Sequence, residues 1–300
     1  MASPSQTTTY SLVVTDANGC SSTNDATATV TVAPVPAPVL TSTACVPPST
    51  DGLVASVPGV GGDTYEWTLT GGTISSGQGT SAITFTSGPA ATLLSLRVDE
   101  TSSEGCVGSA TAVAQVDFTD VPPEDLFHDD VCAIGRAGIT AGCGGGEYCR
   151  NAAVRRDQMA VFLLKAEHGS SYVPPACAGA FPDVPCPSLF ANWVEQLATE
   201  GITAGCGSGN YCPDSAVTRA QMAAFLLKTE HGTTYSPPDC QGIFGDVACP
   251  SQFANWIEAL YGEGITGGCQ AAPLLYCPDN PNTRGQMAVF LRKTFGLPLD

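Results

Sequence analysis

Three arginines stand at corresponding places in a repeated motif, and their setting suits the binding of an anion. The motif reads Thr-Arg-Ala-Gln-Met at residues 218–222, Thr-Arg-Gly-Gln-Met at 283–287 and Arg-Arg-Asp-Gln-Met at 155–159. A guanidinium group can donate two parallel hydrogen bonds to a carboxylate, and the free N–H groups at a helix start also attract anions. The motif therefore predicts three cationic pockets, one for each of the arginines in its second position: Arg156, Arg219 and Arg284.

Each of these arginines is expected in the first turn of a helix. Thr218 and Gln221 have the spacing of a capping box, in which a hydroxyl and an amide satisfy the first N–H groups, and Thr283 and Gln286 repeat it. Arg155 replaces the threonine in the first copy. We expect that change to cost about 0.5–2 kcal/mol unless another group caps the helix.

The helices belong to a longer internal repeat. Phe118, Phe181 and Phe244 each open a Phe-x-Asp segment, 63 residues apart. Every copy continues with a helix, a Gly-Ile-Thr turn, a loop between two cysteines and the second helix. Each copy offers only short helices with one apolar face, so we expect residues 118–170, 171–233 and 234–300 to fold as one unit.

These motifs resemble the S-layer homology domain, and the resemblance covers residues 118–300. It implies an α-helical, pseudo-threefold bundle that binds cell-wall polysaccharide non-covalently, often a polymer that carries pyruvyl ketals. The family usually has Thr-Arg-Ala-Glu where this chain has glutamine, and it typically lacks the cysteine pairs. The glycan-binding residues that we expect on this basis are Arg156, Arg219, Arg284, Gln221, Gln286, Trp193 and Trp256.

Structural roles for the same residues remain open. Each arginine could pair with a carboxylate of a neighbouring copy, and the two glutamines could act only as caps. Trp193 and Trp256 fall at the spacing of a buried helix face, which favours packing.

Other repeated polar residues are interpreted as structural. The aspartates after the opening phenylalanines suit turns or caps, the glutamates on the first helices suit solvent, and the histidines at the ends of the second helices suit C-caps. In order, these are Asp120, Asp183 and Asp246; Glu195 and Glu258; and His168 and His231.

The first third of the chain reads as β-structure. Short alternating segments such as Thr64–Leu69 and Ala110–Val116, separated by turn residues, predict a β-sandwich over residues 38–117. The segment resembles the immunoglobulin-like and PKD-like modules of bacterial surface proteins, which implies Trp67 in the core and a Cys45–Cys106 bridge. Residues 1–37 resemble the last strands of a truncated module and a proline-rich linker. We therefore expect any secretion signal to lie upstream of Met1.

The chain has 14 cysteines, which is typical of an extracellular protein. Close spacing predicts five disulfides in the repeats, and the absence of Cys-x-x-Cys argues against zinc. Cys20 and Cys132 are expected to stay unpaired. The five predicted pairs are Cys143/Cys149, Cys177/Cys186, Cys206/Cys212, Cys240/Cys249 and Cys269/Cys277.

Charge and motif content narrow the function classes. A formal charge of −17 disfavours nucleic acid and anionic membranes as partners, and no segment is apolar enough to span a bilayer. No recurring Ser/His/Asp set or unique acidic pair supports catalysis, so we expect neither an enzyme nor a cofactor or metal.

The sequence thus predicts a multidomain β + α protein, an immunoglobulin-like sandwich followed by a helical bundle. Its expected role is attachment of a secreted protein to an anionic polysaccharide at the cell wall. Two alternatives are a lattice subunit that contacts other surface-layer proteins, and an adhesin whose sandwich modules bind an external partner.

Overall fold

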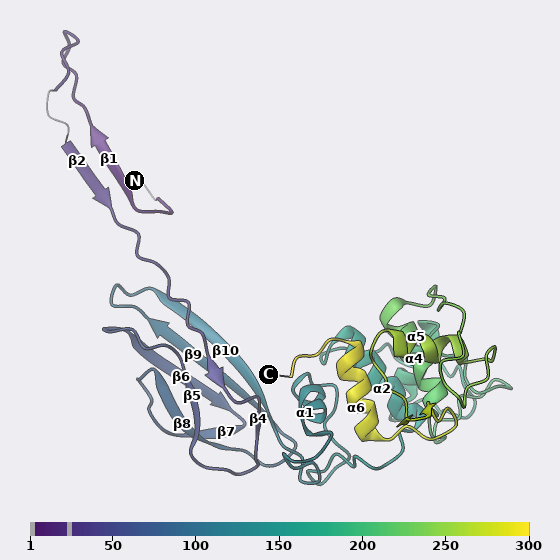
Figure 1. Ribbon diagram of the computed structural model, residues 1–300. Coiled ribbons are helices and arrows are strands. Elements are labelled where there is room, and N and C mark those ends of the chain that lie inside the picture. Colours follow the sequence, from purple (N-terminus) through teal and green to yellow (C-terminus); the bar gives the residue numbers. More distant parts are fainter. Residues whose placement is uncertain (1–3, 23–25, 300) are drawn as a thin grey trace.

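A computed structural model describes residues 4–22 and 26–299 of the chain. Figure 1 shows three parts: a β-hairpin, a pair of packed sheets and a group of helices, with the sheets between the other two. The hairpin pairs β1 (Thr8–Leu12) with β2 (Ala26–Val30) in antiparallel register. Its apolar side chains are uncovered, with Leu12 61% exposed, and residues 31–40 connect it to the sheets.

Two four-stranded sheets form the middle part. One has the order β4-β10-β9-β6 and the other β3-β5-β8-β7; all pairs are antiparallel except β4 with β10. The strands are β3 (Thr41–Ser42), β4 (Cys45–Val46), β5 (Leu53–Ser56), β6 (Thr64–Thr70), β7 (Gly72–Ser76), β8 (Ala82–Ser87), β9 (Leu93–Thr101) and β10 (Val107–Val116).

The facing sides of these two sheets share one core. Alternate residues of β9, namely Leu94, Leu96 and Val98, are fully buried, as expected for strands that present one face inward. Ile83 and Phe85 of β8 pack against them from the opposite sheet. Trp67 is buried there as predicted, and its indole Nε1 donates a hydrogen bond to the carbonyl of Thr80 at 2.8 Å. The arrangement is a two-layer β-sandwich.

The helical part contains two helices from each copy of the repeat. In each copy a nine-residue helix is followed by a longer one, and a short hairpin lies in the third copy. The elements are α1 (His128–Arg136), α2 (Arg156–His168), α3 (Ala191–Thr199), α4 (Arg219–His231), α5 (Ala254–Gly262), β11 (Gln270–Ala271), β12 (Leu274–Leu275) and α6 (Arg284–Thr294).

One hydrophobic core runs through all three copies. Met159, Met222 and Met287, which occupy the same motif position, are fully buried in it together with the second-helix leucines. The fold therefore agrees with the expectation of one shared core. No described helix combines the length and the apolar character needed to cross a bilayer.

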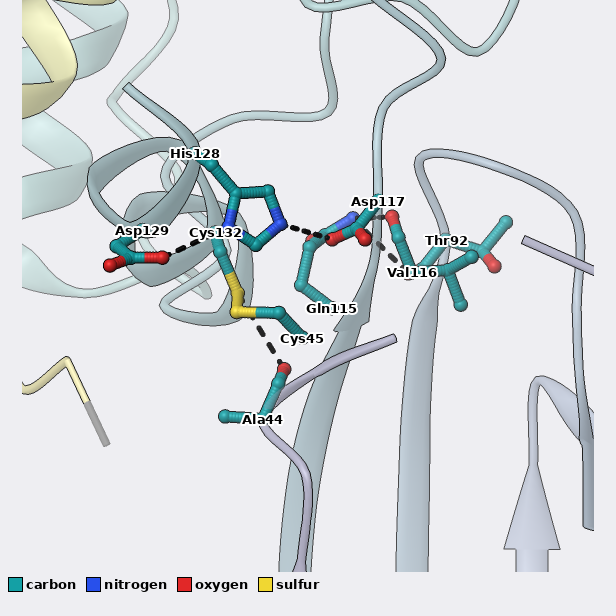
Figure 2. Close-up of polar contacts among 9 residues, drawn as sticks. All are labelled: Ala44, Cys45, Thr92, Gln115, Val116, Asp117, His128, Asp129 and Cys132. Carbon is teal, nitrogen blue, oxygen red and sulfur yellow. Dashed lines mark hydrogen bonds and ion pairs between the residues drawn. A yellow bond between two sulfur atoms is a disulfide. The ribbon is translucent and has the colours of Figure 1, made fainter. Parts of the chain in front are cut away.

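The sandwich and the helices meet between β10 and α1. There Cys45 of β4 forms a disulfide with Cys132 of α1, and the His128 imidazole lies between Asp117 and Asp129, at 3.1 and 2.9 Å (Figure 2). Asp117 is buried, and burial raises the pKa of its carboxyl group while His128 opposes that rise. The joint therefore combines a covalent bond with a buried polar contact.

The Cys45–Cys132 bridge corrects two predictions. Cys45 lies opposite Gln115 near the end of β10, whereas Cys106 precedes the start of that strand. Gln115 lies nine positions after Cys106, or about 30 Å along an extended strand, and disulfides need Cα atoms within about 7 Å. The predicted Cys45–Cys106 bridge is therefore wrong, and so is the prediction of an unpaired Cys132. The unpaired cysteines in the described part of the chain are Cys20 and Cys106.

Candidate functional site

The three arginines of the repeat link each copy to the next. The Nε atom of Arg156 donates a hydrogen bond to the carbonyl of Tyr211 in the second copy, at 2.8 Å. Arg219 makes the same contact with Tyr276 in the third copy, at 2.8 Å. Arg284 makes it with Tyr148 of the first copy, at 2.7 Å. The three contacts therefore close a ring.

Each tyrosine returns a hydrogen bond to the arginine that contacts it. The hydroxyl of Tyr211 donates to the Arg156 carbonyl at 2.7 Å, and the other two pairs repeat this contact at 2.8 Å. The guanidinium carbon of Arg156 also lies 4.9 Å from the centre of the Tyr211 ring and 5.6 Å from that of Phe225. Each arginine is thus held between two aromatic rings, an arrangement favourable to a cation.

Backbone hydrogen bonds close the same ring. Val217 donates its N–H to Val154, Val154 to Asn282, and Asn282 to Val217, each at 2.9 Å. The first N–H group of each second helix also donates to a loop of another copy, as Arg156 does to Ser215 at 3.0 Å. These helix-start N–H groups already donate hydrogen bonds within the protein, so they do not form the free anion site that the sequence suggested.

Each arginine makes a contact between copies, but its partner is not the one that the sequence suggested. Each is only 4% exposed, and each contacts a backbone carbonyl of another copy instead of a carboxylate. Burial lowers the pKa of all three guanidinium groups. One nitrogen is left over on two of them, because the Nη2 atoms of Arg219 and Arg284 are buried without a hydrogen-bond partner. In Arg156 the same atom lies 3.4 Å from the Thr203 hydroxyl.

Two grooves form where three copies meet, and we name each after its arginine. Each combines a Gly-Ile-Thr loop and second helix from one copy, a phenylalanine from the next copy and an arginine from the third. The Arg284 groove is lined by Ile139, Thr140, Ala141, Gly142, Gln158, Val161, Phe162, Lys165, Phe190 and Arg284. The Arg156 groove is lined by Arg156, Ile202, Thr203, Ala204, Gly205, Cys206, Gln221, Ala224, Phe225, Lys228, Gln252 and Phe253.

The charge of the grooves differs from that of the whole molecule. Each contains one arginine and one lysine, and none of the described residues that line them is acidic. Lys165 donates a hydrogen bond to the Gly138 carbonyl at 3.3 Å, and the Lys228 ammonium lies 5.8 Å from the centre of the Trp256 indole ring. These two grooves thus hold four of the 11 basic residues of a chain whose formal charge is −17.

The glutamines of the motif act as caps. The Gln221 side-chain oxygen accepts from the Thr218 N–H, and the Thr218 hydroxyl accepts from the Gln221 N–H, both at 3.3 Å. Thr283 and Gln286 form the same capping box. Gln221 also lines the Arg156 groove.

The first copy has a different cap. The Asp157 carboxylate accepts from the Gln158 N–H at 2.7 Å and also pairs with Arg155. The Asp157 carboxylate therefore caps the helix in place of the threonine hydroxyl that this copy lacks.

Neither of the two predicted tryptophans is among the residues that line the two grooves. Trp193 and Trp256 are half-buried and make edge contacts with Tyr172 and Tyr235, with ring centres 6.1 and 6.0 Å apart. Their packing role is therefore visible in the structure, and Trp256 also supports Lys228.

Several acidic side chains organise loops in a way that the sequence did not indicate. Asp183 accepts the N–H groups of Tyr211 and Cys212, at 2.8 and 2.6 Å; burial raises its pKa, but these hydrogen bonds lower it below the ordinary value. Asp120 and Asp246 make the same contacts in their copies. These aspartates therefore fix a loop that lies 28 residues further on in the first two copies and 30 in the third, not a local turn.

The interpretation of Glu195 and Glu258 as solvated residues is wrong. Glu195 accepts three consecutive backbone N–H groups, those of Ala178, Gly179 and Ala180, at 2.6 to 2.9 Å. Glu258 binds the N–H groups of Gln241 and Ile243 in the same way. A glutamate opposite a Gly-containing loop between cysteines was the one available signal of this role.

The two repeated histidines lie at the ends of their helices, as predicted, but they pair with side chains. His168 lies 2.9 Å from Glu200 and His231 lies 3.0 Å from Glu263, each a residue of the following copy. The five disulfides predicted from close spacing are all formed: Cys143–Cys149, Cys177–Cys186, Cys206–Cys212, Cys240–Cys249 and Cys269–Cys277.

Comparison with known proteins identifies parts of this architecture. Residues 33–116 match the model of a PKD-like domain, and residues 185–223 match that of the S-layer homology domain. An amylopullulanase from Thermoanaerobacterium thermosulfurigenes is 37% identical over 83 residues, which is 26% of this chain and 4% of that protein. The chain thus spans a very small part of that relative. The S-layer homology match implies association with the cell surface or cell wall.

Proposed function

We propose that residues 118–300 are three S-layer homology repeats that attach this protein non-covalently to an anionic cell-wall polysaccharide. The matched segment covers parts of the second copy, and the same arginine–tyrosine contacts recur in all three copies. This recurrence supports a common, pseudo-threefold origin for the whole unit. The two-layer sandwich likewise supports an immunoglobulin-like module in residues 38–117.

The observation that carries the proposal is the concentration of cations in grooves without acidic residues. A strongly acidic protein repels a polyanion over most of its surface, so binding must occur where positive charge is collected. The Arg156 and Arg284 grooves provide such places on a molecule with a charge of −17. They are also concave and partly aromatic, which suits a sugar ring.

The arginines act in this site both as supports and as donors. Their Nε atoms hold the ring closed, and Arg156 and Arg284 also line the two grooves. A carboxylate bound in the Arg156 groove would meet the positive charges of Arg156 and Lys228, and charge-assisted hydrogen bonds are roughly twice as strong as neutral ones. A pyruvyl ketal on a sugar presents such a carboxylate. We propose attachment without catalysis, in which Gln221 shares its amide between the cap and the groove.

A charge reversal at the groove rim tests this function. Lys228→Glu places a negative charge in the Arg156 groove without removing an arginine of the ring. In co-sedimentation assays, the affinity of this variant for purified cell-wall polysaccharide should be at least tenfold lower than that of the wild type. The control, Arg97→Glu, makes the same change in net charge on the sandwich, where Arg97 is half-exposed, and should bind like the wild type. Equal behaviour of the two variants would contradict the proposal.

A further inference from the structure

The two grooves differ in size although they are built from corresponding residues. The cavity of the Arg156 groove measures about 400 Å³ and that of the Arg284 groove about 240 Å³. Most lining positions are identical, including the Ile-Thr-Ala-Gly loop, the glutamine, the second-helix phenylalanine and the lysine. The side chains change at two positions: Ala224 replaces Val161, and Gln252 replaces Leu189.

The larger groove is the exception within the ring. In the third copy Val289 stands at the position of Ala224, and Leu126 of the first copy stands at the position of Gln252. The combination of alanine and glutamine therefore occurs only between the second and third copies. Leu189, Leu126 and Gln252 are all exposed, but of the three only Gln252 is among the residues that line the two described grooves.

The geometry points to Ala224 and Gln252 as specificity-determining residues, an inference that rests on the proposed function. The Arg156 groove admits a sugar that carries a bulky acidic substituent, such as a carboxylate-bearing ketal, and the Arg284 groove does not. The substituent lies over Ala224, within reach of Arg156 and Lys228. The Gln252 amide contacts the hydroxyl groups of the sugar.

Size and hydrogen bonding both support this assignment. Ligand-binding cavities usually measure about 300–1,000 Å³, a range that includes only the larger groove. The two additional methyl groups of valine occupy space on the helix face that alanine leaves open. A single methylene in a binding site changes discrimination by about 10–200-fold. Gln252 adds two donors and an acceptor, whereas leucine offers none.

Reciprocal substitutions test the inference in the full chain. The ligand is a soluble pyruvylated polysaccharide, and the same polymer after mild acid removal of its ketals serves as the reference. In titration calorimetry, Ala224→Val should weaken binding of the pyruvylated polymer at least tenfold, and Gln252→Leu should weaken it severalfold. The double variant Val161→Ala/Leu189→Gln should add a second site of similar affinity. Ala259→Val, the same change on α5 outside both grooves, should bind like the wild type, and melting curves verify that every variant folds.

The outcomes separate this inference from the proposed function. If the wild type binds and Lys228→Glu abolishes binding, but Ala224→Val binds normally, then the assignment of Ala224 is wrong and the proposed function stands. Failure of the double variant to gain a site likewise contradicts the difference between grooves. If the wild type binds neither the pyruvylated polymer nor purified cell-wall polysaccharide, both the function and the inference are overturned.

Discussion

The arginine in the second position of the motif has two roles: it joins neighbouring copies, and in our proposal it also binds a ligand. Its Nε atom and its stacking against tyrosine join neighbouring copies, and in Arg156 and Arg284 the same side chain also lines a groove. The sequence alone presents these as alternatives, because a cation at a helix start suits either a ligand or a neighbour. The structure shows the contact between copies for all three arginines.

This arrangement changes the expected outcome of a conservative substitution. If Arg219 served only a ligand, Arg219→Lys would leave stability unchanged. Lysine cannot reproduce the Nε contact with Tyr276 while stacking on its ring. Loss of this buried hydrogen bond should lower the free energy of unfolding by about 1–3 kcal/mol in chemical denaturation. Arg97→Lys, an exposed control, should change it by less than about 0.5 kcal/mol; equal effects would mean that Arg219 has no structural role.

The tyrosine partners predict sensitivity to alkali. Burial raises the pKa of Tyr148, Tyr211 and Tyr276 above the ordinary value of 10.0, since a buried phenolate is disfavoured. The folded protein therefore keeps these protons at a pH where the unfolded chain has lost them. Their contribution to stability is complete below pH 10 and decreases as the pH rises further. Melting temperatures recorded from pH 8 to 11.5 should fall above pH 10, with tyrosine ionisation at 295 nm appearing together with unfolding; ionisation of all tyrosines before unfolding would contradict this.

At the scale of elements, short loops are organised by carboxylates that receive backbone N–H groups. Glu195 holds the loop at Ala178–Ala180, and the Cys177–Cys186 bridge encloses that segment. The same pair of devices recurs around Glu258 in the third copy. In the first copy the corresponding position is Cys132, which bonds to the sandwich. The same helix position thus supports a loop in the second and third copies and links the first copy to the sandwich.

The substitution Glu195→Gln should make the loop at residues 178–180 less well ordered. Burial raises the pKa of Glu195, but the three N–H donors lower it below the ordinary value, so the charged form fits the loop better. An amide has one acceptor oxygen and cannot receive all three donors as well. Hydrogen exchange at residues 178–180 should become faster in the variant, and also in the wild type when the pH falls and the carboxylate is protonated. Glu66→Gln, on an exposed strand position, should leave these amides unchanged; unaltered exchange in Glu195→Gln would rule out the support role.

Elements with local signals could be predicted, and contacts with distant backbone could not. The capping boxes at Thr218 and Thr283 and the five close disulfides follow from spacing, and the burial of Trp67 is implied by the resemblance to immunoglobulin-like modules. The partner of Arg156 is a carbonyl 55 residues away, and a carbonyl carries no sequence signature. The Cys45 bridge depends on which end of β10 lies beside β4, which strand patterns leave undetermined. The grooves combine side chains from three copies, so they appear only once the ring is assembled.

At the scale of the whole molecule, residues 118–300 should behave as one folding unit. Every copy receives an arginine from one neighbour and contributes one to the other. An isolated copy would therefore expose, on both sides, arginine and tyrosine groups that are buried and hydrogen-bonded in the complete ring. We predict a single melting transition for residues 118–300 by calorimetry. Residues 171–233 alone should give the circular dichroism spectrum of an unfolded chain. A stable, monomeric single copy would contradict the dependence on neighbours.

The closed ring also limits how this gene can change. An open stack of repeats can gain or lose a unit at its end, because the new terminal unit meets only one neighbour. Here the third copy donates back to the first through Arg284 and Tyr148, so there is no end at which a unit could be added. Duplication or deletion of one copy would break contacts on two sides at once. A substitution within a copy, such as one at Ala224, leaves these contacts in place, so single-residue change is the kind of variation that this ring tolerates while its copy number stays at three.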